Sequence, residues 1–320
     1  NVSPNPIVGC VIVHEGKIIG EGYHRQFGGP HAEVHAVEAV LDKDLLREST
    51  VYVTLEPCSH FGKTPPCADL LVSYKVKKVV ICNVDPNPMV SGRGIDKLRT
   101  AGTEVVVGLL QEEGLEVNKR FFTAVIKKRP YIILKWAQTA DGFVARENFD
   151  SKWISNQYSR QLVHKWRSEE DAILVGKNTA QYDNPSLTTR DWHGRNPIRV
   201  VIDRNMELNA DLHLFDGSTE TICFTEQNSV DMQNLHFVCQ EEITPLSVLA
   251  ELHHRDIQSV IIEGGSNTLQ RFIDANLWDE ARVFISTNTF GRGINAPVFS
   301  GKLLSEEDIF ADQLKIYTNQ

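Results

Sequence analysis

Apolar and polar positions in the first 130 residues follow two different periods. Short runs rich in valine and isoleucine predict β-strands, whereas apolar residues spaced three and four apart predict amphipathic helices. The predicted strands cover residues 7–13, 18–20, 50–55, 78–82 and 104–107, and the predicted helices cover 68–73, 94–101 and 112–126, with a further one beginning at Ala32. Because strands and helices alternate, we expect an α/β domain with a largely parallel sheet and helices on both faces.

A charged segment that contains a proline, KKRP at 127–130, interrupts this pattern. Proline breaks helices, so we place a boundary here between a first domain of residues 1–128 and a second of residues 129–320. The second domain is also α/β and shows no internal repeat of the first. Its predicted strands cover 131–136, 172–175, 198–202, 221–224, 236–238, 259–262, 281–286 and 314–317, and its predicted helices cover 156–167, 245–254 and 267–275.

The composition is that of an ordinary globular protein, with 41% hydrophobic and 23% charged residues among 320. A chain of this length is expected to form two domains. No apolar run reaches the roughly 18 residues that cross a bilayer, so we expect no membrane partner. A net charge of -9 opposes binding to nucleic acids, which usually requires a broad basic face, but it allows small anionic ligands.

The N-terminus and the cysteines bear on location. The sequence begins at Asn1 without a methionine or a basic and apolar leader, so we expect no retained secretion signal and infer that some N-terminal sequence is missing. Six cysteines are too few for a disulfide scaffold. Four of them lie in or beside apolar runs, which predicts buried free thiols and a cytoplasmic protein. These four are Cys10, Cys82, Cys223 and Cys239.

The remaining two cysteines belong to a candidate zinc site. His31 precedes a predicted helix, Cys58 follows a predicted strand, and Cys67 precedes another helix. Zinc held by three such ligands keeps a fourth position for water and makes hydroxide available at neutral pH. Glu33 is placed to move a proton between that water and a substrate nitrogen. We expect His35 to lie on the helix face instead, because three ligands and water complete a catalytic site.

The spacing of the two thiols departs from the usual zinc-deaminase pattern of His-x-Glu followed by Pro-Cys-x-x-Cys. Eight residues separate Cys58 from Cys67. With PNPIVG at 4–9, HAEVHA at 31–36 and SHFGKTPPC at 59–67, the sequence closely resembles the bifunctional deaminase/reductase family of bacterial riboflavin biosynthesis. The resemblance extends over essentially the whole chain.

For the first domain, the resemblance implies a cytidine-deaminase-like α/β/α fold acting on a small phosphorylated pyrimidine. Zinc hydroxide would remove the 2-amino group of 2,5-diamino-6-(5-phosphoribosylamino)pyrimidin-4(3H)-one. Lys63, inside the insertion between the thiols, is a candidate partner for the substrate phosphate. The substrate contacts that the matching motif positions imply are Asn5, His24, Lys63, Asp85 and Asn87.

For the second domain, the resemblance implies a dihydrofolate-reductase-like α/β fold that binds NADPH. It would reduce the ribosyl group of 5-amino-6-(5-phosphoribosylamino)uracil to a ribityl chain. No Gly-x-Gly-x-x-Gly follows a first strand, so a Rossmann domain is not supported. Two glycines after Glu263 would instead let backbone N–H groups at a helix N-terminus approach a phosphate.

The implied contacts in the second domain fall into two sets. Ala137 stands where the family has a glycine, and the two arginines of the substrate set suit a phosphate, because a guanidinium can bind two oxygens. The cofactor set is Ala137, Trp153, Thr179, Asp183, Gly265, Ser266, Asn267, Thr268, Leu269, Gln270 and Arg271. The substrate set is Lys135, Ser151, Arg167, Leu187, Arg190 and Glu263.

Two further expectations and two alternatives accompany this interpretation. The family has a helix before the PNPIVG motif, which this sequence lacks, and two-site enzymes of this kind are commonly oligomeric, so we expect a homo-oligomer. One alternative is a deaminase that edits nucleic acid, which the acidic balance opposes. The other is a binding module with a structural zinc, which would require four protein ligands.

Overall fold

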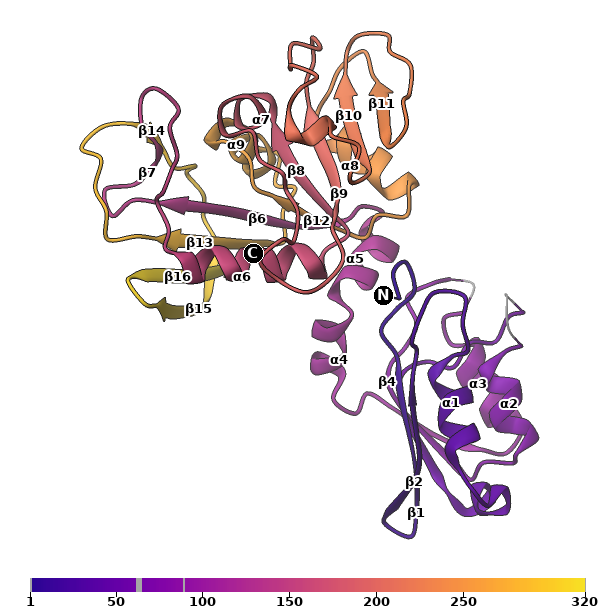
Figure 1. The fold of residues 1–320 in the computed structure, drawn as a ribbon. Coiled ribbons are helices and arrows are strands. Elements are labelled where there is room, and N and C mark those ends of the chain that lie inside the picture. Colours follow the sequence, from indigo (N-terminus) through magenta and orange to yellow (C-terminus); the bar gives the residue numbers. More distant parts are fainter. Residues whose placement is uncertain (1, 62–64, 89, 320) are drawn as a thin grey trace. The chain divides into compact units, whose positions relative to one another are not determined.

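The computed structural model describes residues 2–61, 65–88 and 90–319. It divides into two compact units, Asn1–Lys128 and Arg129–Gln320, and each unit has its own β-sheet (Figure 1). None of the helices in these described ranges is long and apolar enough to cross a membrane.

The sheet of the first unit has five strands in the order β2-β1-β3-β4-β5. Strand β1 runs antiparallel to β2 and β3, and only β3, β4 and β5 are parallel. Only three of the five strands therefore match the expected parallel arrangement. Strands β1 and β2 form an antiparallel hairpin, because Glu15 and Gly16 between them have positive φ values of 47° and 73° and form a tight turn. The strands are β1 (Gly9–His14), β2 (Lys17–Tyr23), β3 (Thr50–Leu55), β4 (Lys78–Asn83) and β5 (Glu104–Val107).

Helices α1, α2 and α3 cover one face of this sheet (Figure 1). The core between them joins Ile12, Val53 and Ile81 of the strands to Ala36 and Leu71 of the helices. Because side chains alternate along a strand, Cys82 faces the other side, where α4 packs. The helices are α1 (Ala32–Ala39), α2 (Cys67–Ser73), α3 (Arg93–Thr100), α4 (Gln111–Val117) and α5 (Lys119–Lys127), with a 3-10 helix at Lys43–Glu48.

The helix predicted at 112–126 is two helices in the structure, α4 and α5, which meet at Asn118. The Asn118 side chain is 2% exposed and forms two hydrogen bonds with the backbone of Ile7. Its Oδ1 accepts the Ile7 N–H at 2.8 Å and its Nδ2 donates to the Ile7 carbonyl at 2.8 Å. This tertiary pairing accompanies the break and holds the segment with the PNPIVG motif.

The sheet of the second unit has nine strands in the order β11-β10-β9-β8-β12-β6-β13-β16-β15. The strands from β11 to β13 are parallel, and β16 and β15 are antiparallel additions at one edge. The strands are β6 (Tyr131–Gln138), β8 (Ala172–Gly176), β9 (Ile198–Ile202), β10 (Thr221–Thr225), β11 (Leu235–Cys239), β12 (Ser259–Ile262), β13 (Glu280–Ile285), β15 (Lys302–Ile309) and β16 (Asp312–Thr318), with a small separate pair β7 (Phe143–Ala145) and β14 (Ile294–Asn295).

Helices cover both faces of this sheet. Ile132 and Leu134 of β6 pack with residues of α8 and α9, whereas the intervening Ile133 packs with Val163 and Trp166 of α6. The continuous burial of β8 follows from this arrangement, because a strand covered on both faces has no polar side. The helices are α6 (Gln157–Glu169), α7 (Lys177–Asp183), α8 (Pro245–His254) and α9 (Ser266–Asp274), with a 3-10 turn at His213–Phe215.

The structure contains two elements that the sequence pattern does not predict. Helix α7 and strand β15 were not predicted, because α7 is largely polar and the outermost strand β15 is mostly exposed and carries three acidic residues, so neither shows an apolar period. The expectation of buried thiols holds for Cys10 and Cys223 but is wrong for Cys82, which is half-buried, and for Cys239, which is exposed. Cys82 lies on the face of the first sheet that α4 covers only in part, and Cys239 lies on the edge strand β11.

Candidate active sites

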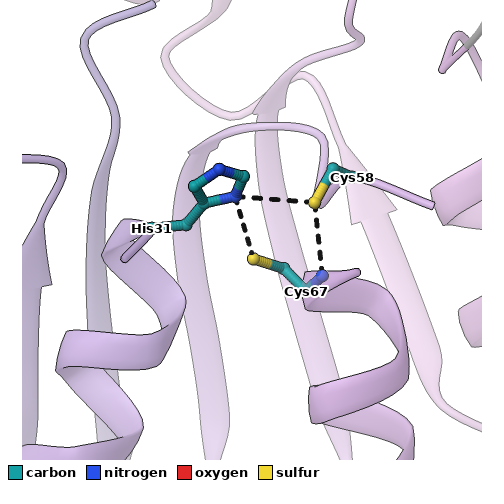
Figure 2. A group of neighbouring side chains, drawn as sticks. All are labelled: His31, Cys58 and Cys67. Carbon is teal, nitrogen blue, oxygen red and sulfur yellow. Dashed lines mark hydrogen bonds between the residues drawn. The ribbon is translucent and has the colours of Figure 1, made fainter. Parts of the chain in front are cut away.

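The three expected zinc ligands meet in the first unit, as Figure 2 shows. His31 caps the start of α1, Cys58 follows β3, and Cys67 is the first residue of α2. The His31 Nδ1 lies 3.5 Å from the Cys58 Sγ and 3.3 Å from the Cys67 Sγ. Zinc bonds of about 2.3 Å to sulfur and about 2.0 Å to nitrogen, arranged as a tetrahedron, would separate S and N by about 3.5 Å. The donor set therefore fits zinc.

The surroundings favour a thiolate at this centre. The Cys67 backbone N–H, at the N-terminus of α2, donates to the Cys58 Sγ at 3.3 Å. Hydrogen bonding from Cys67 lowers the pKa of Cys58 to about 4, whereas the bond to Cys58 and burial raise the pKa of Cys67 well above its usual range. A thiolate at Cys58 suits metal binding, because zinc binds cysteine in its deprotonated form.

Glu33 lies on α1 beside this centre and is 3% exposed. Burial raises the pKa of its carboxyl to about 7. Among the described residues, the cluster within ligand distance contains one imidazole and two thiols and no fourth donor. This arrangement favours an open coordination position over the four protein ligands that a structural zinc site requires.

Two of the predicted substrate contacts, Asn5 and His24, lie beside the candidate metal ligand His31. The His24 Nδ1 lies 3.0 Å from the Pro30 carbonyl, which can only accept, so this nitrogen carries the proton. The Asn5 Nδ2 then donates to the His24 Nε2 at 3.0 Å. The His24 ring also meets His31 edge-on, with the ring centroids 5.4 Å apart.

Asp85 and Asn87 lie on the loop between β4 and α3. The Asp85 carboxylate is buried and accepts the Asn87 backbone N–H at 2.8 Å. Burial raises the pKa of Asp85 to about 6, and Cys58 is among the charges that act on it. The Asp85 backbone N–H donates to the Glu56 carboxylate at 3.3 Å, so Asp85 lies close to the strand end that precedes Cys58. The predicted contact Lys63 lies outside the described residues.

The second unit contains a cavity of about 880 Å³ at the carboxyl ends of β6, β8, β9 and β12. This edge of a parallel sheet is where ligands of α/β proteins usually bind. The six residues of the predicted substrate set line it: Lys135, Ser151, Arg167, Leu187, Arg190 and Glu263. Ten of the predicted cofactor set line it as well: Ala137, Trp153, Thr179, Asp183, Gly265, Ser266, Asn267, Thr268, Leu269 and Arg271.

Gln270 is the member of the predicted cofactor set that is not among the lining residues. Its side-chain amide donates to Asp274 at 2.8 Å and to the Val298 carbonyl at 3.1 Å, and its oxygen accepts the Val298 N–H. Seven consecutive residues span almost two turns of a helix, so their side chains cannot all point to the same side, and this residue faces away from the cavity.

A buried charged group stands at one wall of the cavity. Glu263 forms two hydrogen bonds with Arg167, each of 2.9 Å, and its Oε2 lies 3.6 Å from the Lys135 Nζ. Burial alone would raise the pKa of Glu263, but Arg167 and Lys135 lower it to about 2. Burial lowers the pKa of Lys135, partly offset by Glu263. Two cations thus share one carboxylate, and the excess positive charge favours an anionic ligand.

The turn after β12 comes unusually close to β8. A Cβ on Gly264 would lie 2.7 Å from the Gly176 nitrogen and 2.7 Å from the Val175 Cα. Gly265 has a φ of 35° and caps the start of α9. These two positions therefore require glycine, and the first N–H groups of α9 lie beside the cavity, where a phosphate would find donors.

Sequence reasoning missed a histidine of this cavity. His164 on α6 is 3% exposed, its Nδ1 donates to the Thr188 carbonyl at 2.8 Å, and its Nε2 lies 3.1 Å from Asp191. Burial and the nearby Arg167 lower its pKa. A helical histidine 24 residues from its partner gives no signal in a single sequence.

Two family models divide the chain. Residues 130–317 match the RibD C-terminal domain, and residues 2–83 match the zinc-binding region of cytidine and deoxycytidylate deaminases. The chain is also 40% identical to the riboflavin biosynthesis protein RibD of Aquifex aeolicus (strain VF5), over 91% of this chain and 83% of the relative. The chain belongs to the RibD family. The family inferred from the sequence motifs is therefore confirmed, as are the two α/β folds.

Other RibD proteins show the same extent of similarity. The RibD of Escherichia coli (strain K12) is 37% identical over 90% of this chain and 83% of its own. A crystal structure from Thermotoga maritima, described as a diaminohydroxyphosphoribosylaminopyrimidine deaminase/5-amino-6-(5-phosphoribosylamino)uracil reductase, is 41% identical with a TM-score of 0.91 and covers 99% of this chain and 93% of that one. The Acinetobacter baumannii RibD is 33% identical with a TM-score of 0.89 at the same coverage.

Within the RibD family assignment, the zinc-binding match spans His31, Cys58 and Cys67, the three residues that the structure brings together. The RibD C-terminal match spans the whole lining of the 880 Å³ cavity. Each of the two family matches thus coincides with one candidate site.

Proposed function

We propose that this RibD family member catalyses two consecutive reactions of riboflavin biosynthesis. The unit of residues 1–128 deaminates 2,5-diamino-6-(5-phosphoribosylamino)pyrimidin-4(3H)-one. The unit of residues 129–320 reduces the ribosyl group of the resulting 5-amino-6-(5-phosphoribosylamino)uracil with NADPH. The observation that supports this most directly is the cluster of His31, Cys58 and Cys67 with buried Glu33, in a chain that is 41% identical to the Thermotoga deaminase/reductase.

In the deaminase unit, His31, Cys58 and Cys67 would hold a zinc ion. When bound, zinc would supply Lewis acidity and lower the pKa of a water molecule toward neutrality. Glu33 accepts a proton in its ionised form and donates it to the departing amino nitrogen in its protonated form. Asn5, His24, Asp85 and Asn87 bind the pyrimidine and its sugar, and Lys63 remains the proposed phosphate partner.

In the reductase unit, NADPH supplies the hydride and the chain positions it. The start of α9 and the close turn at Gly264 and Gly265 offer backbone donors to the cofactor phosphates. Ser151 of the proposed substrate set donates its hydroxyl hydrogen to Asp183 of the proposed cofactor set at 2.9 Å. Arg167 and Arg190 suit the substrate phosphate, while Lys135 and Glu263 hold the polar part of the sugar.

The test is an assay of both steps on the phosphoribosylated diaminopyrimidine with one purified protein. We expect ammonia release without NADPH and, when NADPH is added, oxidation of about one NADPH for each ammonia released. The variant Glu33→Gln should lose ammonia release by a factor of about 100 or more while keeping its zinc, and it should still reduce the deaminated intermediate when this is supplied. A protein that releases no ammonia and oxidises no NADPH contradicts the proposal.

A further inference from the structure

A second buried carboxylate, Glu56, lies at the end of β3, two residues before Cys58, and none of the roles above includes it. Glu56 is only 4% exposed. Its two oxygens together accept four backbone N–H groups. Oε2 accepts those of Asp85 (3.3 Å) and Gly92 (3.0 Å), and Oε1 accepts those of Gly94 (2.9 Å) and Ile95 (3.3 Å).

Three of these four donors belong to the start of α3, of which Gly92 is the cap. The first N–H groups of a helix have no partner inside it, and the helix dipole favours a negative charge at this end. A buried carboxylate is costly unless its oxygens are hydrogen-bonded. Glu56 and α3 therefore satisfy each other, although nearly 40 residues separate them in the sequence.

The fourth donor connects Glu56 to the proposed substrate contacts. The loop between β4 and α3 carries Asp85 and Asn87, and both of its ends are held by Glu56, through the N–H groups of Asp85 and Gly92. The Asp85 carboxylate in turn accepts the Asn87 N–H at 2.8 Å. Two successive hydrogen bonds thus lead from Glu56 to the Asn87 backbone.

The start of α3 also packs directly against the segment after β3 that carries Cys58. A Cβ on Gly94 would lie only 2.0 Å from the Pro57 carbonyl, so the helix start lies directly on the backbone next to Cys58. The loop with Asp85 and Asn87 and the segment with Cys58 are therefore held together by one carboxylate and one close backbone contact.

We propose that Glu56 is a positioning residue of the deaminase reaction, which holds Asp85 and Asn87 at a fixed distance from the metal ligand Cys58 so that the pyrimidine is bound beside the metal. This rests on the proposed deaminase function. Glu56 touches neither metal nor substrate in this role. Its loss should weaken substrate binding and leave metal binding intact.

The test variant is Glu56→Gln. An amide accepts through one atom only, so its NH2 group would face two of the four backbone donors. We expect wild-type zinc content, a KM for deamination raised about tenfold with a smaller change in kcat, and faster hydrogen exchange at the amides of Asp85 and Gly92. Reduction of supplied deaminated intermediate should be unchanged, which serves as an internal control.

A matched control in the same unit is Thr103→Val. The buried Thr103 hydroxyl donates to the Val76 carbonyl at 3.0 Å, at the amino end of the parallel strands and thus at the opposite edge of the sheet from the site. This variant loses one buried hydrogen bond at nearly constant shape, so it measures general destabilisation. We expect its KM to equal that of the wild type.

The outcomes are distinct. A folded Glu56→Gln protein with wild-type KM and wild-type amide exchange overturns the proposal, and so does loss of zinc, because Glu56 would then assemble the metal ligands. If Glu56→Gln does not fold, Glu56→Asp, which keeps the charge, decides by the same measurements, and its failure to fold also overturns the proposal. If the wild-type protein releases no ammonia, the proposed function is wrong. Amide exchange does not depend on turnover, so it still tests whether Glu56 holds the loop.

Discussion

Glu33 and Glu263 are both almost fully buried, yet their surroundings shift the pKa values of the two carboxyls in opposite directions. Burial raises that of Glu33 to about 7, while two cations bring that of Glu263 down to about 2. The difference lies in the neighbours, because burial disfavours the ionised carboxylate of Glu33, whereas the two cations beside Glu263 favour its ionised form. Glu33 is thereby suited to proton transfer, and Glu263 remains a fixed negative charge.

We predict that the substitution Glu263→Gln destabilises the second unit. The variant leaves the buried guanidinium of Arg167 without its carboxylate, and breaking a buried pair from one side typically costs about 3 to 5 kcal/mol. The free energy of unfolding of the second unit, measured by denaturant titration, should fall by this amount. The control is Glu207→Gln, since Glu207 pairs with Lys177 at the exposed rim of the same cavity. That change should have little effect.

The same carboxylate predicts a pH dependence. The pKa of Glu263 in the folded protein, about 2, lies below its ordinary value of 4.5, so the folded state binds this proton less readily than the unfolded state. The stabilisation is present in full above about pH 4.5 and is lost as the pH falls toward 2. Between these values the wild type should lose stability more steeply than Glu263→Gln. Equal slopes would show that the charged pair contributes nothing to stability.

At the level of secondary structure, both candidate sites lie at the N-terminal ends of helices. His31, Cys67 and Gly265 stand at the starts of α1, α2 and α9. Apolar periodicity predicted these three helices to within a residue or two, since the core faces of α1 and α2 and the face of α9 are regular. The candidate zinc ligands could be predicted from the sequence because His-x-Glu and Pro-Cys are short local motifs at the ends of such elements.

Other parts of the fold depend on contacts between distant residues and could not be predicted from the sequence. The break at Asn118 accompanies pairing with Ile7, and Glu263 binds an arginine 96 residues away. Glu56 precedes a proline in a strand end, which gives no indication that it caps a helix. Local periodicity reports which face of an element is buried, but it does not report which polar group meets which.

We predict that Gly264→Ala disturbs the junction of β12 with β8. The added methyl group would lie 2.7 Å from backbone atoms of Val175 and Gly176, closer than side chains approach, so the strands must separate. Overpacking of this kind costs about 1 to 3 kcal/mol. The shift should displace the start of α9 and raise the KM for NADPH, measured by initial rates of NADPH oxidation. Ammonia release by the first unit should be unchanged, and a normal KM would show that α9 does not contact the cofactor.

At the scale of the whole molecule, each unit has its own sheet, its own core clusters and its own candidate site. The sequence predicted two α/β units because the segment at 127–130 interrupts the periodic pattern. It could not give the strand order of the second sheet, where β12 inserts between β8 and β6. Glu263 is next to Lys135 and Arg167 because of that insertion.

This organisation predicts two unfolding transitions that respond to different ligands. Saturation with NADPH, the proposed cofactor, at about 100 times its Kd should stabilise the second unit by about 2.7 kcal/mol, because a ligand that binds only the folded state shifts the unfolding equilibrium by this amount. Removal of zinc by a chelator should lower the transition of the first unit, where His31, Cys58 and Cys67 lose their common partner. Differential scanning calorimetry with each treatment separates the two effects.

The variant Cys58→Ser provides the control, since its first transition should no longer respond to chelator while the response to NADPH persists. A shift of both transitions by either treatment would show that the two sites are coupled in stability.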